Sequence, residues 1–232
     1  MSCQYITTKG DHMASKQDIA RELLRIRAVF LRPDEPFTWA SGIRSPIYCD
    51  NRLTLSYPAV RTLVDESIAG MVQELHPDAQ ALMGTSTAGI AHAAIAADRL
   101  GLPMGYVRGS AKDHGRKNQI EGRLEEGERV VVIEDLISTG GSVLDCVGSL
   151  REAGADVLGI VSIFTYGMRE GIRRLAAADV ENHSLCDLDI LVDVAVEEGY
   201  IARSDRVRLL TFRDNPSDES WIQPEGPSAC ER

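Results

Sequence analysis

The sequence predicts an α/β fold with a central, mainly parallel sheet that helices cover on both faces. Two apolar runs, VVVI at 130–133 and the run within 156–165, lack the alternation of a half-exposed strand. Such continuous runs are typical of parallel strands that are buried on both faces. Helical patterns separate the strands along the chain, which favours parallel strands joined by crossovers. A length of 232 residues is enough for one sizeable domain of this kind.

The N-terminal part supplies two helices and a strand-rich segment between them. Residues 15–31 have the periodicity of an amphipathic helix, and Ser15 is placed to cap its N-terminus. In 36–52, turn residues separate two short strand-like pieces. A helix is predicted over 58–75, because Pro58 fits the first helical position.

The middle of the chain continues the alternation. Residues 79–89 are predicted to form a strand and a tight loop, followed by a helix over 90–100 that Gly101 ends. A strand is expected at 103–108. Residues 109–128 are polar, dotted with glycine and too long for an ordinary connection, which indicates a functional loop.

The C-terminal part begins with a strand at 129–134, which leads through a loop to a helix at 141–153 ended by Gly154. A strand at 156–165 follows. Three helical segments are expected to complete the fold, near 168–178, 187–198 and 202–212.

The chain is expected to consist of one domain at 15–214 with an extension at each end. Residues 1–14 show no periodicity and form an arm, which is either native or in part a remnant of a cloning vector. The tail at 215–232 is rich in proline, serine and acidic residues and is expected to be irregular.

Composition excludes several classes of protein. The net charge of −10 argues against a general binder of nucleic acid or anionic membranes, because phosphate attracts cationic surfaces. No apolar run is long enough to span a bilayer. The five cysteines are scattered and never in CxxC spacing, which favours free thiols in a reducing compartment. We therefore expect a soluble, cytoplasmic protein that binds neither nucleic acid nor membrane.

The stretch VVVIEDLISTGGS at 130–142 carries the first functional signal. Small and hydroxylated residues that lead into a helix leave backbone N–H groups free to bind an anion, and the helix dipole adds to the attraction. This predicts a phosphate-binding loop, which lacks the lysine of a Walker A motif. Glu134 and Asp135 would repel phosphate, but they can accept hydrogen bonds from sugar hydroxyls or attract a cation. A 5-phosphorylated ribose suits both parts of the stretch, with its phosphate on the loop and its hydroxyls on the two acids. The alternative without a ligand is a strand that ends on two solvated acids before a helix cap.

This stretch resembles the phosphoribosyl-pyrophosphate (PRPP) signature of type I phosphoribosyltransferases. Two further stretches resemble orotate phosphoribosyltransferases in particular. VRGSAKDHGRKNQIEG at 107–122 resembles their catalytic loop, with Arg108 and the run 112–115, and FTWASGIRSPIYCDNRLTLSYP at 37–58 resembles their N-terminal orotate hood. The resemblance covers about 16–214 and implies a type I phosphoribosyltransferase fold with a small N-terminal hood.

The resemblance implies transfer of the ribosyl 5-phosphate group of PRPP to orotate, giving orotidine 5-monophosphate and pyrophosphate in pyrimidine biosynthesis. Residues 108–123 carry five cationic and two acidic side chains, a net charge of +3 that suits pyrophosphate, although a solvated charged loop is the plainer alternative. The expected catalytic residues are Arg108, Lys112, His114 and Asp135. The expected PRPP-binding residues are Arg108, Lys112, His114, Glu134, Asp135, Leu136, Ile137, Ser138, Thr139, Gly140, Gly141 and Ser142. Ser138 and Arg44 are expected to bind orotate.

No protein metal site is expected, because Mg²⁺ would arrive bound to PRPP. The expected partners are PRPP, orotate and a second copy of the chain, in a homodimer that shares its catalytic loops across the interface. Two alternatives stay open: a phosphoribosyltransferase for another base, and a regulator that kept the PRPP fold without catalysis.

The sequence also departs from the family pattern. Gly109 and Ala88 stand where many members have lysine, so two cationic contacts to PRPP are absent. Gly167 stands where some members have an arginine that contacts orotate, and Arg44 replaces a common lysine. The residues expected at the PRPP site therefore follow the family more closely than those expected to bind orotate.

Overall fold

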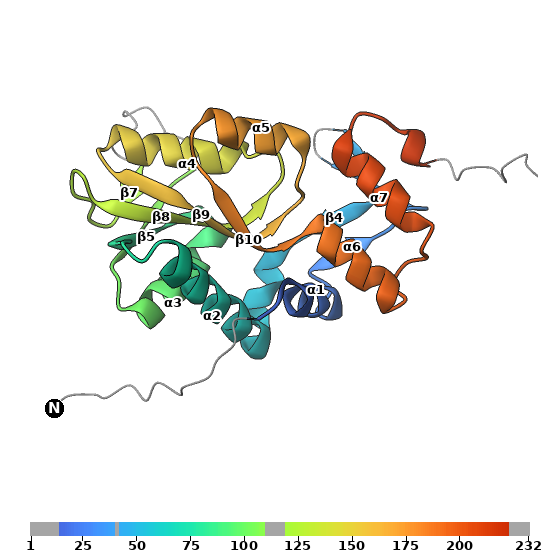
Figure 1. Ribbon diagram of the computed structural model, residues 1–232, viewed down its shortest axis with the longest axis horizontal. Helices are drawn as coiled ribbons and strands as arrows, with labels where there is room; N and C mark the ends of the chain where they lie inside the picture. The colour runs from blue at the N-terminus through green and yellow to red at the C-terminus, as the bar shows by residue number, and fades with distance from the viewer. Residues whose placement is uncertain (1–13, 40–41, 110–118, 223–232) are drawn as a thin grey trace, which may run out of the picture.

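A six-stranded sheet forms the centre of the molecule (Figure 1). The computed structural model describes residues 14–39, 42–109 and 119–222. In spatial order the strands are β10 (Asn182–Asp187), β9 (Asp156–Thr165), β8 (Arg129–Ile137), β5 (Ala81–Thr85), β6 (Met104–Val107) and β7 (Ile120–Glu121). The first five run parallel and β7 pairs antiparallel with β6, so the predicted mainly parallel sheet is confirmed.

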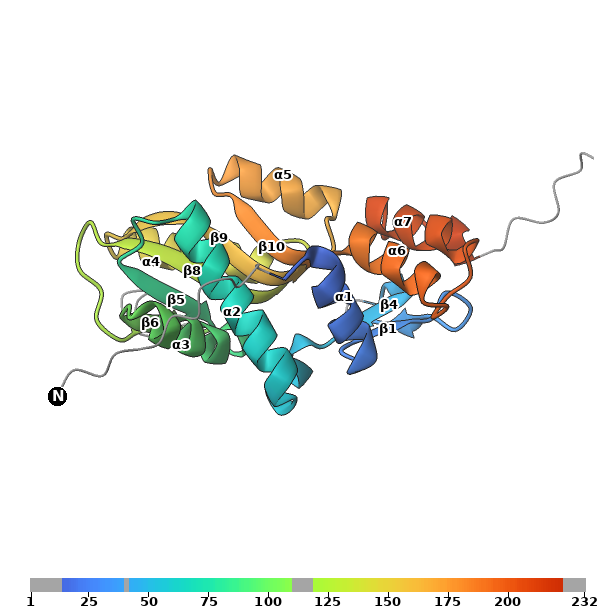
Figure 2. The same ribbon diagram turned by 60° about the horizontal axis from the view of Figure 1, so that its bottom comes forward.

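Helices cover both faces of this sheet, as the continuous apolar strands require. Figure 1 shows α4 and α5 along one face and α2 and α3 along the other, and Figure 2 shows the same layers after rotation. The bounds of these helices are Gly141–Glu152 for α4, Arg169–Ala177 for α5, Pro58–Leu75 for α2 and Ala88–Leu100 for α3. Pro58 begins α2 and Gly101 ends α3 with φ 66°, as expected.

A smaller unit lies beside the end of the sheet that carries β10 (Figure 2). Its short strands form two antiparallel pairs, β1 with β4 and β2 with β3. The elements of this unit are α1 (Lys16–Arg25), β1 (Val29–Leu31), β2 (Phe37–Thr38), β3 (Arg44–Ser45), β4 (Ile47–Cys49), the 3-10 helix η1 (Asn51–Ser56), α6 (Leu188–Glu197), α7 (Asp205–Asp214) and the 3-10 turn η3 (Ser220–Ile222). The predicted N-terminal hood at 37–58 contains β2, β3, β4 and η1, and β1 pairs with its strand β4.

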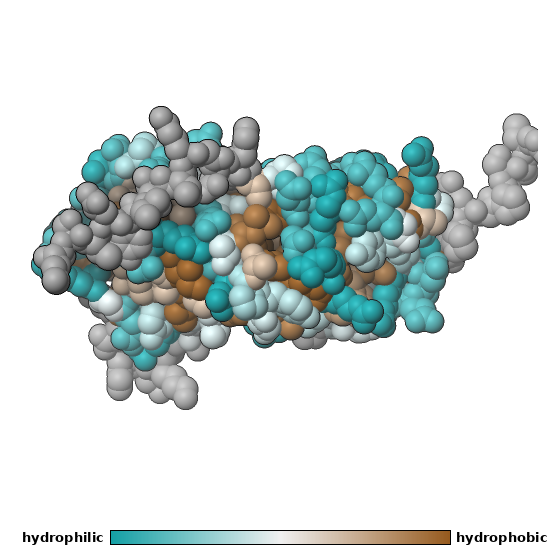
Figure 3. Space-filling view, turned by 90° about the horizontal axis from the view of Figure 1, so that it is seen from below, coloured by the Kyte–Doolittle hydropathy of each residue, from teal (hydrophilic) through white to brown (hydrophobic). Residues whose placement is uncertain are grey.

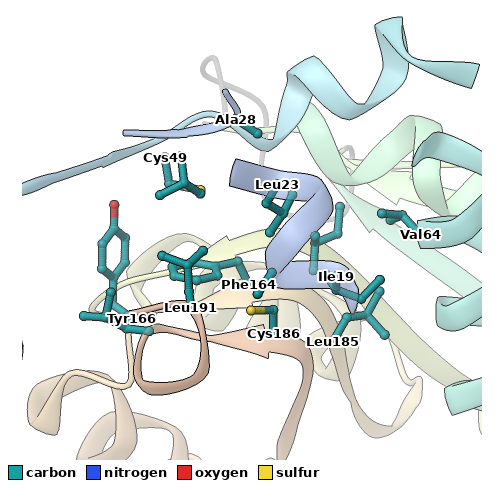
Figure 4. Close-up of a cluster of buried hydrophobic side chains, with 14 of the residues drawn as sticks. Ile19, Leu23, Ala28, Cys49, Val64, Phe164, Tyr166, Leu185, Cys186 and Leu191 are labelled. Carbon is teal, nitrogen blue, oxygen red and sulfur yellow. The ribbon is translucent and has the colours of Figure 1, made fainter. Parts of the chain in front are cut away.

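The main hydrophobic core joins this unit to the sheet. Figure 4 shows side chains of α1, such as Leu23, facing Phe164 of β9, with Cys49 of β4 and Tyr166 close by. Leu23 and Phe164 are fully buried. A second buried cluster lies beneath α4 and includes Val132 and Leu150. Because one continuous core connects hood and sheet, the hood is held in a fixed position over the carboxyl ends of the strands.

The prediction of one helix over 15–31 is wrong in its last third. Ser15 caps α1 as expected, but the helix ends at Arg25 and Val29–Leu31 forms strand β1, which pairs with β4. Arg27 adopts a positive φ of 57°, and the N–H of Ala28 donates to the carbonyl of Leu23 at 2.9 Å. The apolar run at 28–31 fits a helix or a strand, and pairing with β4 selects the strand.

The strand predicted at 129–134 is longer than expected. β8 continues through Asp135 to Ile137 because β9 remains paired with it as far as Ile137↔Thr165. The expectation that the strand ends on the two acids is therefore wrong: Glu134 and Asp135 lie within the ladder, which fixes their backbone.

Two strands of the central sheet were not predicted. β7 lies within the long segment 109–128, of which 110–118 falls outside the described residues. β10 has the polar sequence NHSLCD and no strand-like apolar run. Its hydroxyls pair inside the sheet, where Ser184 Oγ lies 2.6 Å from Ser162 Oγ of β9.

The described part of the C-terminal tail packs on the domain. Trp221 is 2% exposed and its ring stacks edge-on against Phe212 of α7 at 5.7 Å between centroids. The arm at 1–13 and residues 223–232 fall outside the described residues. In the part of the chain that the structure describes, no helix combines the length and apolarity needed to cross a bilayer.

Candidate active site

A cavity of about 410 Å³ opens where β5 and β8 end. In parallel α/β sheets this carboxyl edge is where ligands bind. Its walls come from the hood, from the β5–α3 turn and from the stretch after β8. The lining residues are Cys49, Asp50, Arg52, Ser86, Thr87, Ala88, Glu134, Asp135, Leu136, Ser138 and Ser142.

Glu134 is the buried member of the acid pair, with 5% of its surface exposed. Thr85 Oγ1 donates to Glu134 Oε1 at 2.7 Å, and the N–H of Asp135 donates to the same oxygen at 2.9 Å. Burial, and secondarily the neighbouring carboxyl of Asp135, raise the pKa of Glu134 to about 8. Burial therefore favours the protonated form of Glu134 near neutral pH.

This raised pKa predicts a pH-dependent effect of Glu134→Gln on stability. In the unfolded chain the carboxyl of Glu134 has its ordinary pKa of about 4.5, whereas in the folded protein the pKa is raised to about 8. Between these values the folded state binds more protons, so Glu134 lowers the free energy of unfolding as pH rises. Glutamine removes this dependence.

The stability of Glu134→Gln relative to wild type should therefore increase between pH 5 and pH 8, by about 1 kcal/mol or more. Urea denaturation at several pH values measures the difference. A difference that does not change with pH would contradict the raised pKa.

Asp135 is half-buried and lines the cavity. Its main-chain oxygen accepts a hydrogen bond from Asn51 Nδ2 at 2.7 Å, so the hood holds the acid strand directly. β5 pairs with β8 only as far as Gly84↔Ile133, and the Asn51 amide binds β8 two residues beyond this point. The carboxylate of Asp135 is thus presented on a backbone that is fixed from outside the sheet.

The predicted phosphate loop joins β8 to the N-terminus of α4. Gly140 adopts φ 75° there, a conformation that glycine reaches without strain. The first N–H groups of α4 have no partner within the helix and carry the positive end of its dipole. Arg174 of α5 supports the loop from outside, since its Nη1 donates to the carbonyl of Thr139 at 3.3 Å. This arrangement can bind a phosphate dianion.

The β5–α3 turn forms the opposite wall. Ser86 Oγ accepts a hydrogen bond from the N–H of Gly109 at 2.6 Å, which ties the start of the predicted catalytic loop to this turn. A second cavity of about 530 Å³ adjoins the first through Ser86 and Ser142, and Arg108 and Gln119 line it. Arg108 also forms an ion pair with Glu121 at 3.4 Å. A cationic side chain therefore lies next to the cavity that holds the acids.

The structure does not bring every predicted site residue together. Arg44 is not among the described residues that line either cavity; its guanidinium lies 4.0 Å from Glu219. Lys112 and His114 fall outside the described residues. Gly167 lies with Ser138 on a third cavity of about 450 Å³, beneath α5.

Sequence reasoning missed three residues that build this site. Thr85 holds the carboxylate of Glu134, Asn51 holds the backbone of Asp135, and Arg52 lines the cavity while its guanidinium binds Asp50 at 2.6 and 2.8 Å. Thr85 and Asn51 act across 49 and 84 positions of the chain. Short-range patterns carry no signal for such contacts.

Among the described residues, no group of three or more histidine, cysteine, aspartate or glutamate side chains is arranged to hold a metal ion. Three carboxyls line the cavity, those of Asp50, Glu134 and Asp135, and Asp50 is already bound to Arg52. A hard cation at this position would need most of its oxygen ligands from a bound substrate or from water.

Comparison with known proteins identifies the family. The family model of the phosphoribosyl transferase domain matches residues 55–184, more than half of the chain. Orotate phosphoribosyltransferase of Bacillus cytotoxicus is 56% identical over 207 residues, which cover 89% of this chain and 99% of that protein. The chain belongs to the orotate phosphoribosyltransferase family. The enzyme of Bacillus anthracis is similar to it to the same degree, with 56% identity over 207 residues.

Solved structures agree with this membership of the orotate phosphoribosyltransferase family. Orotate phosphoribosyltransferase from Aeropyrum pernix has 29% identity and a TM-score of 0.69, covering 79% of this chain and 99% of that one. UMP synthase of Leishmania donovani has 26% identity and a TM-score of 0.74, covering 86% of this chain and 42% of that one. The predicted type I phosphoribosyltransferase fold is thereby confirmed.

Proposed function

We propose that this orotate phosphoribosyltransferase family member transfers the ribosyl 5-phosphate group of PRPP to N1 of orotate, giving orotidine 5-monophosphate and pyrophosphate. The product is the precursor of UMP in pyrimidine biosynthesis. One observation carries the proposal: the acid pair Glu134–Asp135 lines one cavity together with Ser138 and Ser142, which flank the glycine loop at the start of α4. Together they offer sites for the hydroxyls and for the phosphate of one phosphorylated ribose.

Each part of the cavity has a role in this reaction. The 2- and 3-hydroxyls of ribose donate to Asp135 and Glu134, and the 5-phosphate binds the N–H groups and hydroxyls of residues 138–142. The β5–α3 turn supplies backbone amides for pyrophosphate. Ser138, which lines the same cavity, contacts orotate. Arg44, on strand β3 of the hood, keeps its proposed orotate role, for which its guanidinium would have to turn from Glu219 toward the cavity.

The chemical step needs no nucleophile from the protein. What the protein must stabilise is the charge that develops on the ribose and on the leaving pyrophosphate. Cleavage of the anomeric C–O bond gives the ribose oxocarbenium character, as in glycoside cleavage. The carboxylate of Asp135 stabilises this positive charge, while Arg108, Lys112 and His114 stabilise the departing pyrophosphate. Ring-deprotonated orotate attacks C1, so alignment of the two substrates provides the remaining acceleration.

Magnesium is proposed to enter with PRPP. It would neutralise charge on the pyrophosphate oxygens, and the acid pair would face it from the ribose side. Asp135 is the protein group best placed for such contact, because it is the more exposed acid of the pair.

The reaction is tested by following the absorbance of orotate with PRPP and Mg²⁺, with uracil, adenine and hypoxanthine as competing bases. Consumption of orotate alone supports the proposal. Consumption of another base instead would support the alternative of a different base-specific phosphoribosyltransferase. Binding of PRPP without consumption of any base would support a non-catalytic regulator.

We also propose a homodimer in which each chain supplies Lys112 to the site of the other. Apolar patches interrupt the hydrophilic surface seen in Figure 3, and a second copy could cover such patches. A cytoplasmic location fits the thiols, since Cys49, Cys146 and Cys186 are free and buried.

The shared site predicts complementation between two inactive variants. Lys112→Ala and Asp135→Asn, unfolded and refolded together, form mixed dimers in which one site holds an intact Asp135 and the partner's intact Lys112. Half of the dimers are mixed with random pairing and each has one good site, so about a quarter of wild-type activity should return. Activity at the single-variant floor, in a sample shown to contain mixed dimers, would exclude sharing.

A further inference from the structure

A buried chain of hydrogen bonds runs from α2 and α3 to the acid strand β8. Asn51 Nδ2 donates to the main-chain oxygen of Asp135 at 2.7 Å, and Thr54 Oγ1 donates to the main-chain oxygen of Asn51 at 2.6 Å. His92 Nε2 lies 3.2 Å from Thr54 Oγ1, and His92 Nδ1 lies 2.6 Å from Asp65 Oδ1. Asn51, Thr54 and Asp65 are fully buried and His92 is 1% exposed. We call these four side chains the buried network.

The geometry fixes the direction of each bond. The carbonyl of Asn51 can only accept, so the single hydroxyl proton of Thr54 points to it. Thr54 must then accept from His92, which places a proton on His92 Nε2. His92 Nδ1 and Asp65 Oδ1, 2.6 Å apart, share the last hydrogen bond of the chain. Asp65 Oδ2, the other oxygen of this buried carboxyl, has no hydrogen-bond partner among the described residues, so the network leaves one buried polar atom unsatisfied.

Asn51 is fixed at both ends of its amide. Its Nδ2 must face the carbonyl of Asp135, because that oxygen needs a donor, and its Oδ1 accepts from Cys49 Sγ at 3.2 Å. A rotated amide would place two acceptors against each other. The contact to Asp135 is thus oriented by the hood strand β4 as well as by Thr54.

The buried network links two walls of the candidate active site. His92 lies one helical turn after Ala88, which lines the cavity with Thr87 at the start of α3. At its other end the network reaches Asp135, the acid on the facing wall. The first turn of α3 and the hydrogen bonds of the network therefore lead from the turn proposed for pyrophosphate to the acid proposed for the ribose hydroxyls.

We infer that the buried network positions Asp135 for PRPP, so that Asn51, Thr54, His92 and Asp65 are positioning residues of the reaction. This inference rests on the proposed function. None of the four is among the described residues that line the cavity, so they act through the backbone of β8. A buried polar network is weak evidence for stability, and this one reaches the site through the hydrogen bond from Asn51 to the backbone of β8.

Paired substitutions at Thr54 separate positioning from stability. Thr54→Ser removes a buried methyl group but keeps the hydroxyl, whereas Thr54→Val keeps the shape and removes the hydroxyl. Both should lower the melting temperature. PRPP affinity, measured by titration calorimetry with Mg²⁺, should stay within about twofold for Thr54→Ser and fall about tenfold for Thr54→Val. Ser67→Ala is the control, because it removes a buried hydroxyl of α2 that binds Leu63 outside the network.

A double-variant cycle identifies Asp135 as the target. The loss from Thr54→Val should shrink to less than about twofold when Asp135 is already Asn, because a misplaced carboxylate costs nothing once it is absent. The loss of PRPP affinity from Asn51→Ala should likewise shrink when Asp135 is already Asn, which gives a second, independent double-variant cycle. Equal losses in both backgrounds, or wild-type affinity of Thr54→Val, would overturn the inference. If wild-type protein bound PRPP but did not consume orotate, the proposed function would be wrong. The inference about the buried network would still be tested, because the measurements of PRPP affinity do not involve orotate.

Discussion

Asp135→Asn is expected to lower kcat/KM for PRPP by about a hundredfold or more, with the fold unchanged. The carboxylate lines the cavity and faces the sugar in the proposed complex. Its charge matters most when positive charge develops on the ribose, so the substitution should reduce kcat as well as affinity. The hydrogen bonds that fix Asp135 use its main-chain N–H and C=O, which Asn retains.

Steady-state kinetics and a melting curve test this prediction together. Asp98→Asn is the matched control, because it makes the same chemical change at an exposed position of α3. The control should keep kcat/KM within about twofold. If Asp135→Asn had wild-type kinetics, the ribose role of the acid pair would be wrong.

The sequence predicted the sheet and most helices because their signals are local. Buried parallel strands such as 130–133 read as apolar runs, and Pro58 and Gly101 mark helix ends by their own conformational preferences. The end of the first helix could not be predicted, since the run at 28–31 becomes a strand only by pairing with β4. β10 could not be predicted either, because its polar side chains bind one another within the sheet.

The candidate site divides in the same way. Glu134, Asp135 and the glycine loop are contiguous, so their chemistry is readable from the sequence. The proton held by Glu134 was not readable, because it follows from burial and from Thr85, which is 49 positions away. Arg44 lies beside Glu219 on the hood instead of the cavity wall, a placement that the tertiary arrangement of the C-terminal segment decides.

The second large effect is expected from Gly171→Ala. A Cβ atom at this buried position of α5 would lie under 3.0 Å from the carbonyl oxygen of Ser138 and 3.6 Å from the carbonyl carbon of Thr139. Backbone atoms cannot rotate away as a side chain can, so either α5 or the phosphate loop must move. Arg174 ties the loop to α5 through Thr139, so displacement at one end would strain this contact too.

Gly171→Ala should therefore lose about 1–3 kcal/mol of unfolding free energy and raise the KM for PRPP about tenfold or more. Gly148→Ala in α4 is the matched stability control, because no atom outside its own helix lies within 4 Å of the added Cβ. That variant should gain up to about 1 kcal/mol from the better helix propensity of alanine. Urea denaturation and PRPP kinetics of both variants separate the effect of the steric contact at position 171 from the effect of alanine on helix propensity. If Gly171→Ala were as stable as Gly148→Ala and kept its KM, the close approach of α5 to Ser138 would not determine the geometry of the phosphate loop.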